Sequence, residues 1–471
     1  MKRTLAMLLA VLMMGGLVAC GKNETPAPAD PTPAVSDTEA TEPVVEKQVL
    51  NLWSFTDEVP KMVNYYISQN PEFGEKYEVK TTIIATDGGG YQTALDQALA
   101  AGGEDCPDIY CAEAAFILKY AQGDAAKYAG TYEDLGIDVA AKTKEADIAQ
   151  YTIDIATRPE DGKLVGLGYQ ATGGAFIYRA SIAEEVFGSS DAKVVEEAIG
   201  AGTGNWDKFW EAAAALKDKG YPIVSGDGDV WHAVENSSDT GWIVDGNLNI
   251  DAKREAFFDI SKKLYDNGWT NKTSDWTDAW YADMAGTSET PAFGFFGPAW
   301  LINYTIAPQA NGNPSFGDWR VCAPPVGFFW GGTWLLSSKE ASDVKEGVAE
   351  LIEWITLDCT KDGLQYAWAN GTVDWDKDPS TVTSKDCVAS GTVMAMSEGS
   401  VELLGGQDMF PAFIAGNAYA NGKCLTQYDE SINQQFRDQV NQYSSGQKDL
   451  ETALADFIQA CGDNFDLFIA E

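Results

Sequence analysis

The chain has 471 residues, and its 71 acidic against 32 basic residues give a formal net charge of −39 at pH 7. That charge would repel a nucleic-acid backbone and would gain nothing from an anionic lipid surface, so we expect no nucleic-acid partner. Residues 48–471 are too many for one hydrophobic core, which predicts two lobes.

Residues 1–20 have the pattern of a secretion signal. Lys2 and Arg3 precede an apolar run that is too short for a typical membrane span. The segment ends in Leu-Val-Ala-Cys-Gly, which resembles a bacterial lipobox and would make Cys20 the lipidated first residue of the mature protein. Two acyl chains, such as palmitate, would anchor it to the cell membrane. An ordinary cleavable signal with a chance cysteine is the alternative.

Residues 21–47 are predicted to form a disordered tether. They are rich in Pro, Ala, Thr and acidic residues and poor in aromatic ones. Such a composition cannot bury enough apolar surface to offset the entropy lost on ordering, and its prolines keep the chain extended. The tether would space the folded part from the membrane.

The first third of the folded part alternates strands with helices. Strands are predicted at residues 49–53, 77–84 and 108–111, and helices at 61–69, 91–101 and through 116–118. This order is typical of an α/β fold with a mostly parallel sheet and helices on both faces. Ligands bind beyond the carboxyl ends of the strands in such sheets, which places residues 54–58, 88–90 and 112–116 along a cleft.

The stretch from Trp269 to Trp334 holds seven of the fifteen tryptophans. At its middle lies Phe-Gly-Phe-Phe-Gly-Pro-Ala-Trp300, an aromatic run with chain-bending residues. Because a buried indole usually needs a partner for its N–H, tryptophans near turns suggest amphipathic walls around a ligand with flat apolar faces and polar edges, such as a sugar. Core packing is the alternative for each of them.

Several short motifs follow one another along residues 48–471. They are a first strand ending at Trp53, then Cys106-Pro107-Asp108-Ile109, Leu164-Val-Gly-Leu-Gly168, Gly174-Ala-Phe-Ile-Tyr178, Phe295-Phe-Gly-Pro-Ala-Trp300, Val321-Cys-Ala-Pro-Pro325, Gly331-Gly-Thr-Trp334 and Tyr428-Asp-Glu-Ser-Ile-Asn433. Each motif is weak alone. Their order, together with the lipobox, resembles the extracellular solute-binding proteins of ABC importers, in the sugar-binding branch that includes maltose-binding protein.

The resemblance implies a periplasmic-binding-protein-like fold with two α/β lobes and a ligand cleft between them. The chain would cross between the lobes near residues 169–175, near 321–325 and after residue 355. One lobe would comprise residues 48–169 plus 326–360, and the other would comprise residues 170–325 plus 361–471.

Sugar recognition needs aromatic faces for the C–H side of a pyranose and polar side chains for its hydroxyl groups. The resemblance gives four aromatic candidates, at a strand end, a loop of the second lobe, the Gly-Pro-Ala-Trp turn and the strand after the second crossing: Trp53, Trp231, Trp300 and Trp334. Trp300 and Trp334 would lie on opposite sides of one ligand. Trp269, Trp276 and Trp319 are interpreted as packing.

Polar candidates come from strand ends, the first crossing and a late loop. They are Asp57, Glu58, Glu113, Gln170, Thr172 and Asp408. A solvated loop acid is the alternative for each carboxylate. Where the maltose-binding branch has an aspartate–arginine pair, this chain has Glu113-Ala-Ala115, and Thr172 replaces an acid on the crossing. Maltodextrin specificity is therefore not expected, whereas glycan binding still is.

No catalytic or metal centre is expected. The only histidine, His232, has no nucleophile signature nearby, and the seven cysteines after Cys20 lack zinc-ligand spacing. Asp374 to Asp378 begins like a calcium loop, but Pro379 occupies its turn-glycine position. Glycoside hydrolysis by a carboxylate pair stays open among so many acids, although the later chain lacks the rhythm of a (β/α)8 barrel.

We therefore expect a lipid-anchored, extracytoplasmic receptor that captures an oligosaccharide or sugar by hinge closure. It would deliver its ligand to an ABC permease in the membrane whose ATPase lies on another chain. It would act as a monomer, without a cofactor and without catalysis. The alternatives are a receptor of the same fold for a peptide or a polyol, and a surface glycoside hydrolase or glycan-adhesion lipoprotein.

Overall fold

The computed structural model describes residues 46–375 and 383–469. The signal segment, Cys20 and nearly all of the predicted tether lie outside the described residues, as does part of the calcium-like loop. Among the described helices, none is long and apolar enough to cross a membrane. All seven cysteines after Cys20 are free thiols.

The larger of two main sheets has five strands in the order β2-β1-β3-β12-β6. Its strands are β1 (Gln48–Ser54), β2 (Tyr77–Ile83), β3 (Ile109–Glu113), β6 (Gly166–Gly168) and β12 (Thr333–Ser337). The first three run parallel, as predicted. β12 differs, because it runs antiparallel to both β3 and β6.

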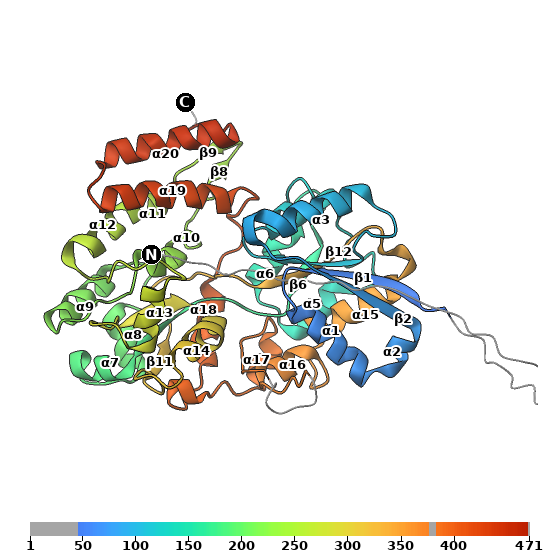
Figure 1. Ribbon diagram of the computed structural model, residues 1–471, viewed down its shortest axis with the longest axis horizontal. Coiled ribbons are helices and arrows are strands. Elements are labelled where there is room, and N and C mark those ends of the chain that lie inside the picture. The colour runs from blue at the N-terminus through green and yellow to red at the C-terminus, as the bar shows by residue number, and fades with distance from the viewer. Residues whose placement is uncertain (1–45, 376–382, 470–471) are drawn as a thin grey trace, which may run out of the picture. The chain divides into compact units, whose positions relative to one another are not determined.

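Helices cover both faces of the larger sheet. Figure 1 shows α3 (Gly90–Ala101) on one side, with α1 (Glu58–Gln69) and α15 (Lys345–Thr356) on the other. In α1 the buried Val59, Met62, Val63 and Tyr66 recur at helical spacing and form its inner face. The other helices of this part are α2 (Pro71–Lys76), α4 (Ile117–Ala121), α5 (Val139–Ala146), α6 (Gln150–Ile155), α16 (Leu364–Ala369) and α17 (Gly391–Ala395).

The smaller main sheet is antiparallel, in the order β10-β7-β11. Its strands are β7 (Ala175–Arg179), β10 (Gly294–Gly297) and β11 (Trp319–Cys322). Every residue of β7 is buried because both faces of this sheet are covered. Phe176 and Tyr178 belong to one hydrophobic cluster, and Ala175 and Ile177 belong to the other, which continues into the larger sheet.

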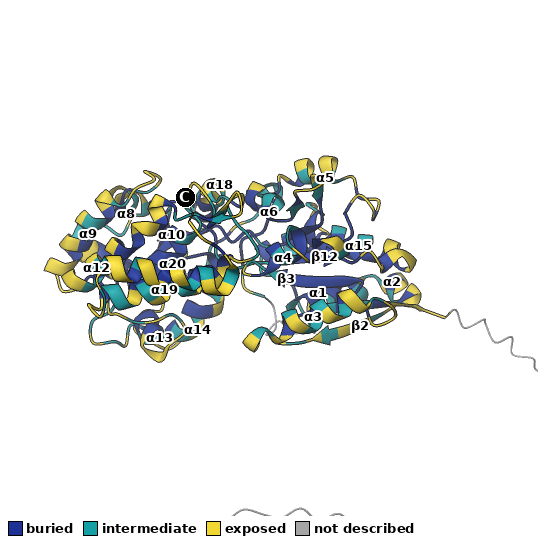
Figure 2. Ribbon diagram, turned by 90° about the horizontal axis from the view of Figure 1, so that it is seen from above, coloured by how far each residue is buried: buried dark blue, intermediate teal, exposed yellow. Residues whose placement is uncertain are grey.

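Helices of 4 to 16 residues surround the smaller sheet, and the longer ones have buried inner faces and exposed outer faces (Figure 2). They are α7 (Ala180–Phe187), α8 (Ala192–Ile199), α9 (Asp207–Asp218), α10 (Asp227–Glu235), α11 (Ala252–Glu255), α12 (Phe257–Asn267), α13 (Asp278–Ala285), a π-helix at Leu301–Ile306, α14 (Ala307–Ala310), α18 (Phe410–Tyr419), α19 (Asp429–Ser444) and α20 (Leu450–Phe465). Two further short sheets pair β4 (Thr157–Arg158) with β5 (Lys163–Leu164), and β8 (Ile243–Val244) with β9 (Asn247–Leu248).

Two chain segments join the two main sheets. Residues 169–174 lead from β6 to β7, and residues 323–332 lead from β11 to β12. The two segments pair with each other, because the Gly174 N–H donates to the Phe328 carbonyl at 2.9 Å and the Trp330 N–H donates to the Thr172 carbonyl at 3.1 Å. These paired crossings hold the ends of both sheets together.

Candidate functional site

One edge of the larger sheet gathers several of the predicted residues. Thr333 pairs with Glu113, and Trp334 pairs with Gly168, so the start of β12 lies beside the ends of β3 and β6. The end of β1, with Trp53, lies at the same edge because β1 and β3 are parallel. The edge therefore has the position at which α/β sheets bind ligands.

Trp300 also lies near this edge, and the smaller sheet positions it there. It follows β10 by three residues, and Gly297, the last residue of β10, pairs with Ala175, where β7 begins. The turn with Trp300 is thus next to the crossing that leads into β7.

The predicted residues converge on Gly331 and Gly332. Both glycines have positive φ, at +73° and +108°, which favours glycine. A Cβ atom at Gly331 would lie 3.2 Å from Nε1 of Trp300 and 3.5 Å from Oε1 of Glu113. Thr172 donates from Oγ1 to the Gly331 carbonyl at 2.8 Å. Glu113, Thr172 and Trp300 therefore surround the second crossing.

An aromatic cluster extends from this point. The rings of Trp276 and Trp300 are parallel within 7°, with centroids 6.2 Å apart, and Trp330 meets Trp300 edge-on at 4.8 Å. The Trp300 N–H donates to the Trp330 carbonyl at 2.9 Å. His232 stacks on Trp330 with centroids 3.6 Å apart, and its Nε2 lies 3.1 Å from Asp275. We call the side chains of Trp276, Trp300, Trp330 and His232, together with Asp275, the aromatic cluster.

Trp276 is the unexpected member of this cluster. Its side chain is 49% exposed, so the interpretation of Trp276 as packing was wrong. Its φ of +65° lies in the left-handed region, which is costly for a bulky residue and is typical of functional sites. Trp269 and Trp319 are buried, which confirms their interpretation as packing.

A second polar group lies around Glu58. The hydroxyl of Tyr169 donates to the Glu58 carboxylate, and Gln170 donates to Asp386 at 3.2 Å. Burial raises the pKa of Glu58 to about 8, with a further contribution from Asp386, and burial raises the pKa of Asp386 to about 7. Glu58 and Gln170 are thus brought together through a carboxylate that the sequence did not single out.

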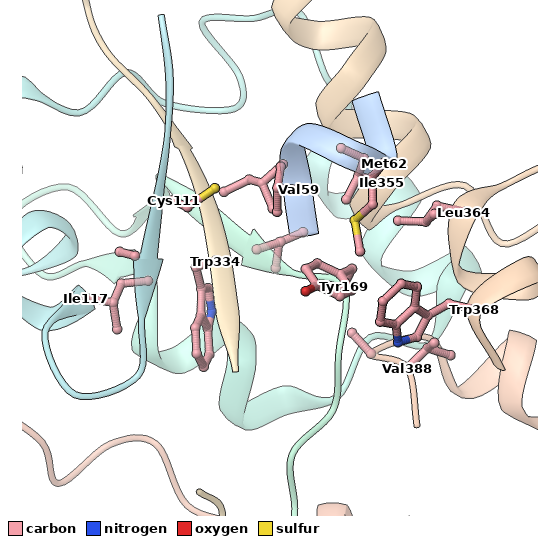
Figure 3. Packing of buried hydrophobic residues seen from close by; sticks show 14 of the residues in the cluster. Val59, Met62, Cys111, Ile117, Tyr169, Trp334, Ile355, Leu364, Trp368 and Val388 are labelled. Carbon is pink, nitrogen blue, oxygen red and sulfur yellow. The ribbon is translucent and has the colours of Figure 1, made fainter. Parts of the chain in front are cut away.

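Two aromatic candidates lie in the hydrophobic cores. Trp334 is 1% exposed, and its N–H donates to the Thr152 carbonyl at 3.1 Å. Figure 3 shows its ring among buried apolar side chains. Trp231 is 2% exposed and packs against Phe257 and Phe436. Their role as ligand contacts stays a prediction. The geometry gives Trp334 a packing role, whereas Trp231 packs in the core and also lines a cavity beside the aromatic cluster.

The remaining candidates are held by local interactions. Asp57 is exposed and forms an ion pair with Lys61 at 2.7 Å. Asp408 accepts the backbone N–H groups of Gly399 and Phe410 and so shapes its own loop. The side chain of Trp53 is partly buried against the core.

Sequence reasoning missed four residues of this region: Trp276, Trp330, Asp275 and Asp386. Trp330 had a usable signal, because it immediately precedes the glycine pair. Asp386 had none, since its contact with Gln170 joins positions 216 residues apart. In the part of the chain that the structure describes, no three His, Cys, Asp or Glu side chains are grouped to hold a metal ion.

The profile of one protein family, described as "Bacterial extracellular solute-binding protein", matches residues 71–375. The chain belongs to this family. Solute-binding proteins of the family are extracellular, which places this one outside the cytoplasm. None of the curated proteins matches the sequence.

Solved structures of solute-binding proteins share the fold. An extracellular solute-binding protein of family 1 has a TM-score of 0.69 at 19% identity, covering 88% of this chain and 99% of its own. A galacto-N-biose/lacto-N-biose I-binding protein from Bifidobacterium longum has 0.62 at 16%, covering 90% and 99%. The sugar-binding protein MalE from Xanthomonas citri has 0.61 at 17%, covering 88% and 97%. This solute-binding protein therefore has their two-lobed α/β fold.

Proposed function

We propose that this solute-binding protein captures a sugar or oligosaccharide for an ABC importer. The observation that carries the proposal is the aromatic cluster at the meeting point of the two sheets. Trp276, Trp300 and Trp330 offer flat apolar surfaces there, and Glu113 lies beside them as a hydrogen-bonding group. Aromatic faces with polar side chains at their edges match the two kinds of surface of a pyranose.

The structural neighbours support the same ligand class. The Bifidobacterium longum protein was solved with lacto-N-biose, and a related binding protein from Bifidobacterium animalis was solved with β-1,6-galactobiose. For this chain we propose binding by closure of the two lobes about the paired crossings. We propose the lobe boundaries at residues 48–169 plus 326–360 and 170–325 plus 361–471, except that α16 and α17, which pack with α15 and α5, go with the first lobe. Ligand contacts from both lobes would favour the closed form.

Delivery would require a membrane permease and a separate ATPase. We propose that the signal segment is cleaved off before Cys20 and that acyl chains on Cys20 hold the monomeric receptor at the cell membrane. Residues 21–47 would then form the tether between the membrane and the folded part. Metabolic labelling with radioactive palmitate tests the anchor: the wild-type chain should be labelled and Cys20→Ala should not.

Calorimetry against oligosaccharides, monosaccharides, peptides and polyols tests the ligand class. We expect binding of at least one sugar and no release of reducing ends from it. Sugar cleavage would overturn the receptor proposal in favour of a glycoside hydrolase. Exclusive binding of a peptide or a polyol would overturn the proposed ligand class and leave the receptor role in place.

A further inference from the structure

A cavity of about 230 Å³ lies next to the aromatic cluster. Its wall combines the end of β3, the helices α10 and α19 and the second crossing, so both lobes contribute to it. Trp330 and His232 of the aromatic cluster form part of the wall. A ligand held on the aromatic cluster would therefore reach into this cavity.

Four carboxylates belong to the polar part of the wall. Glu113 comes from β3, Glu235 from α10, and Asp429 and Glu430 from α19. The four acids come from three separate parts of the sequence, and all of them line one shared space. Like charges gathered in a partly buried space repel each other unless a cation compensates them or a proton neutralises one of them.

The nearby basic groups already have partners. Arg437 is, apart from His232, the only basic side chain that lines the cavity in the described residues, and its Nη1 lies 3.9 Å from Asp275. His232 bonds to the same Asp275. Arg254 lies behind the wall, 1% exposed, and donates to the backbone carbonyls of Thr240 and Glu235. These groups leave the wall with an excess of negative charge.

Two side chains of the wall have an unused polar atom. His232 and Asp429 are each only 8% exposed, and Nδ1 of His232 and Oδ2 of Asp429 have no hydrogen-bond partner. Buried polar atoms without partners are uncommon in folded proteins, and each one costs free energy. A ligand with hydrogen-bonding groups in the cavity would remove part of this cost.

Titration of the acids is consistent with a missing positive charge. Burial raises the pKa of Glu113 to about 7 and that of Asp429 to about 6, and it also raises the pKa of Glu235 and of Glu430. Arg254 lowers the pKa of Asp429, and His232, Arg254 and Arg437 lower that of Glu235, yet neither effect offsets burial.

We propose that the cavity receives a protonated amino group of the ligand, so that the solute is an amine-bearing sugar rather than a neutral one. The inference rests on the proposed function and narrows its substrate class. An ammonium group would donate hydrogen bonds to the carboxylates and would compensate their charge. The ring of Trp330 on the same wall would add a cation–π contribution.

Matched sugars test the inference by calorimetry on the full-length protein in detergent. Each set contains oligosaccharides of one linkage and length that carry a free amine, an N-acetyl group or a hydroxyl at the same position, in the gluco and the galacto series. We expect an amine-bearing member to bind at least about tenfold more tightly than its acetylated and neutral counterparts. If the amine-bearing sugar binds no more tightly than its counterparts in every set that shows binding, the amine inference fails and the proposed sugar-binding function stands.

Two further outcomes separate the inference from the proposed function. If a simple diamine binds and no sugar does, the sugar proposal fails while the ammonium site stands. If neither class binds, both fail. Among variants, Glu430→Gln should remove most of the preference for the amine over the N-acetyl form. Glu255→Gln, a change of an acid in α11 that does not line the cavity, should keep the preference. Unchanged preference in Glu430→Gln and Glu113→Gln, each with wild-type melting, would also overturn the inference.

Discussion

Two tryptophans four positions apart show how differently this molecule uses the same residue. Trp334 lies in β12, 1% exposed, with its N–H bonded to the Thr152 carbonyl. Trp330 lies on the crossing just before that strand, where it is partly exposed and stacks on His232. The start of the strand separates the two roles. Inside the sheet the indole of Trp334 packs in the core, and four residues earlier the indole of Trp330 forms a wall of the candidate site.

The two regions also differ in local strain and charge. Around Trp334 the strand is buried and regular, with apolar neighbours. The candidate site, in contrast, contains Trp276, whose backbone φ is in the left-handed region. It also contains the carboxyl groups of Glu58 and Glu113, whose pKa values are raised. Local departures of this kind are expected where binding, rather than stability, determines the sequence.

The largest expected effect tests the core side of the comparison. Trp334→Ala should lower the free energy of unfolding by about 3–5 kcal/mol, because it removes a large buried side chain and leaves a cavity. Trp334→Phe should cost less. Urea unfolding measures both. If Trp334→Ala kept its stability but lost ligand affinity, Trp334 would be the ligand platform that the sequence predicted.

A second substitution tests how tightly the crossings are held. Gly416 of α18 faces the first crossing, and a Cβ atom there would lie 2.1 Å from the carbonyl oxygen of Gly174. Gly416→Ala should therefore lower the free energy of unfolding by about 1–3 kcal/mol, because the backbone must shift. Ala418→Ser, an exposed change on the same helix, is the control.

The ligand affinity of Gly416→Ala extends this test. Because the substitution displaces the crossing beside the aromatic cluster, we expect weaker sugar binding by calorimetry. Wild-type stability together with wild-type affinity would show that α18 does not constrain the crossings.

Trp276 tests the site side of the comparison. Trp276→Gly should weaken sugar binding about tenfold, because it removes an exposed ring that lies parallel to Trp300. Trp276→Ala should lose the same affinity but be less stable than Trp276→Gly by about 1–2 kcal/mol, because alanine keeps the strained left-handed φ. Equal affinity in wild type and both variants would show that Trp276 is an exposed surface residue that does not contact the ligand.

The first third of the folded part was predictable because its elements follow local rules. The apolar runs at β1 and β3 and the spacing of α1 and α3 are visible in the sequence, and the structure confirms them. The direction of β12 was not visible, since a short buried strand carries no signal of its orientation. The turn at Trp300 was recognisable from its Gly-Pro motif, and it lies at the candidate site.

The failures at the site have a common physical cause. Whether a tryptophan lies in a core or on a wall depends on contacts with residues far away in the sequence, as between Trp334 and Thr152. The left-handed φ of Trp276 also depends on its surroundings, because no local rule favours tryptophan there. The order of the motifs therefore predicted where the candidate site lies, whereas the contacts of its individual residues could be seen only in the structure.

The last expected effect concerns pH. Burial raises the pKa of Glu58 from 4.5 to about 8, so the folded state binds this proton more tightly than the unfolded state does. The resulting stabilisation is complete below about pH 4.5 and is lost as the pH rises through about 8. Asp386 acts in the same direction, with its pKa raised to about 7.

Urea midpoints measured at about pH 5 and about pH 9 should therefore fall at the higher pH, and the fall should be smaller in Glu58→Gln, whose side chain cannot ionise. Asp57→Asn is the matched control, because Asp57 is the exposed neighbour of Glu58 and pairs with Lys61 on the surface. An equal fall in Glu58→Gln and wild type would mean that the carboxyl groups at the sheet edge are solvated like those elsewhere, and the contrast with the core would then rest on Trp276 and the aromatic cluster alone.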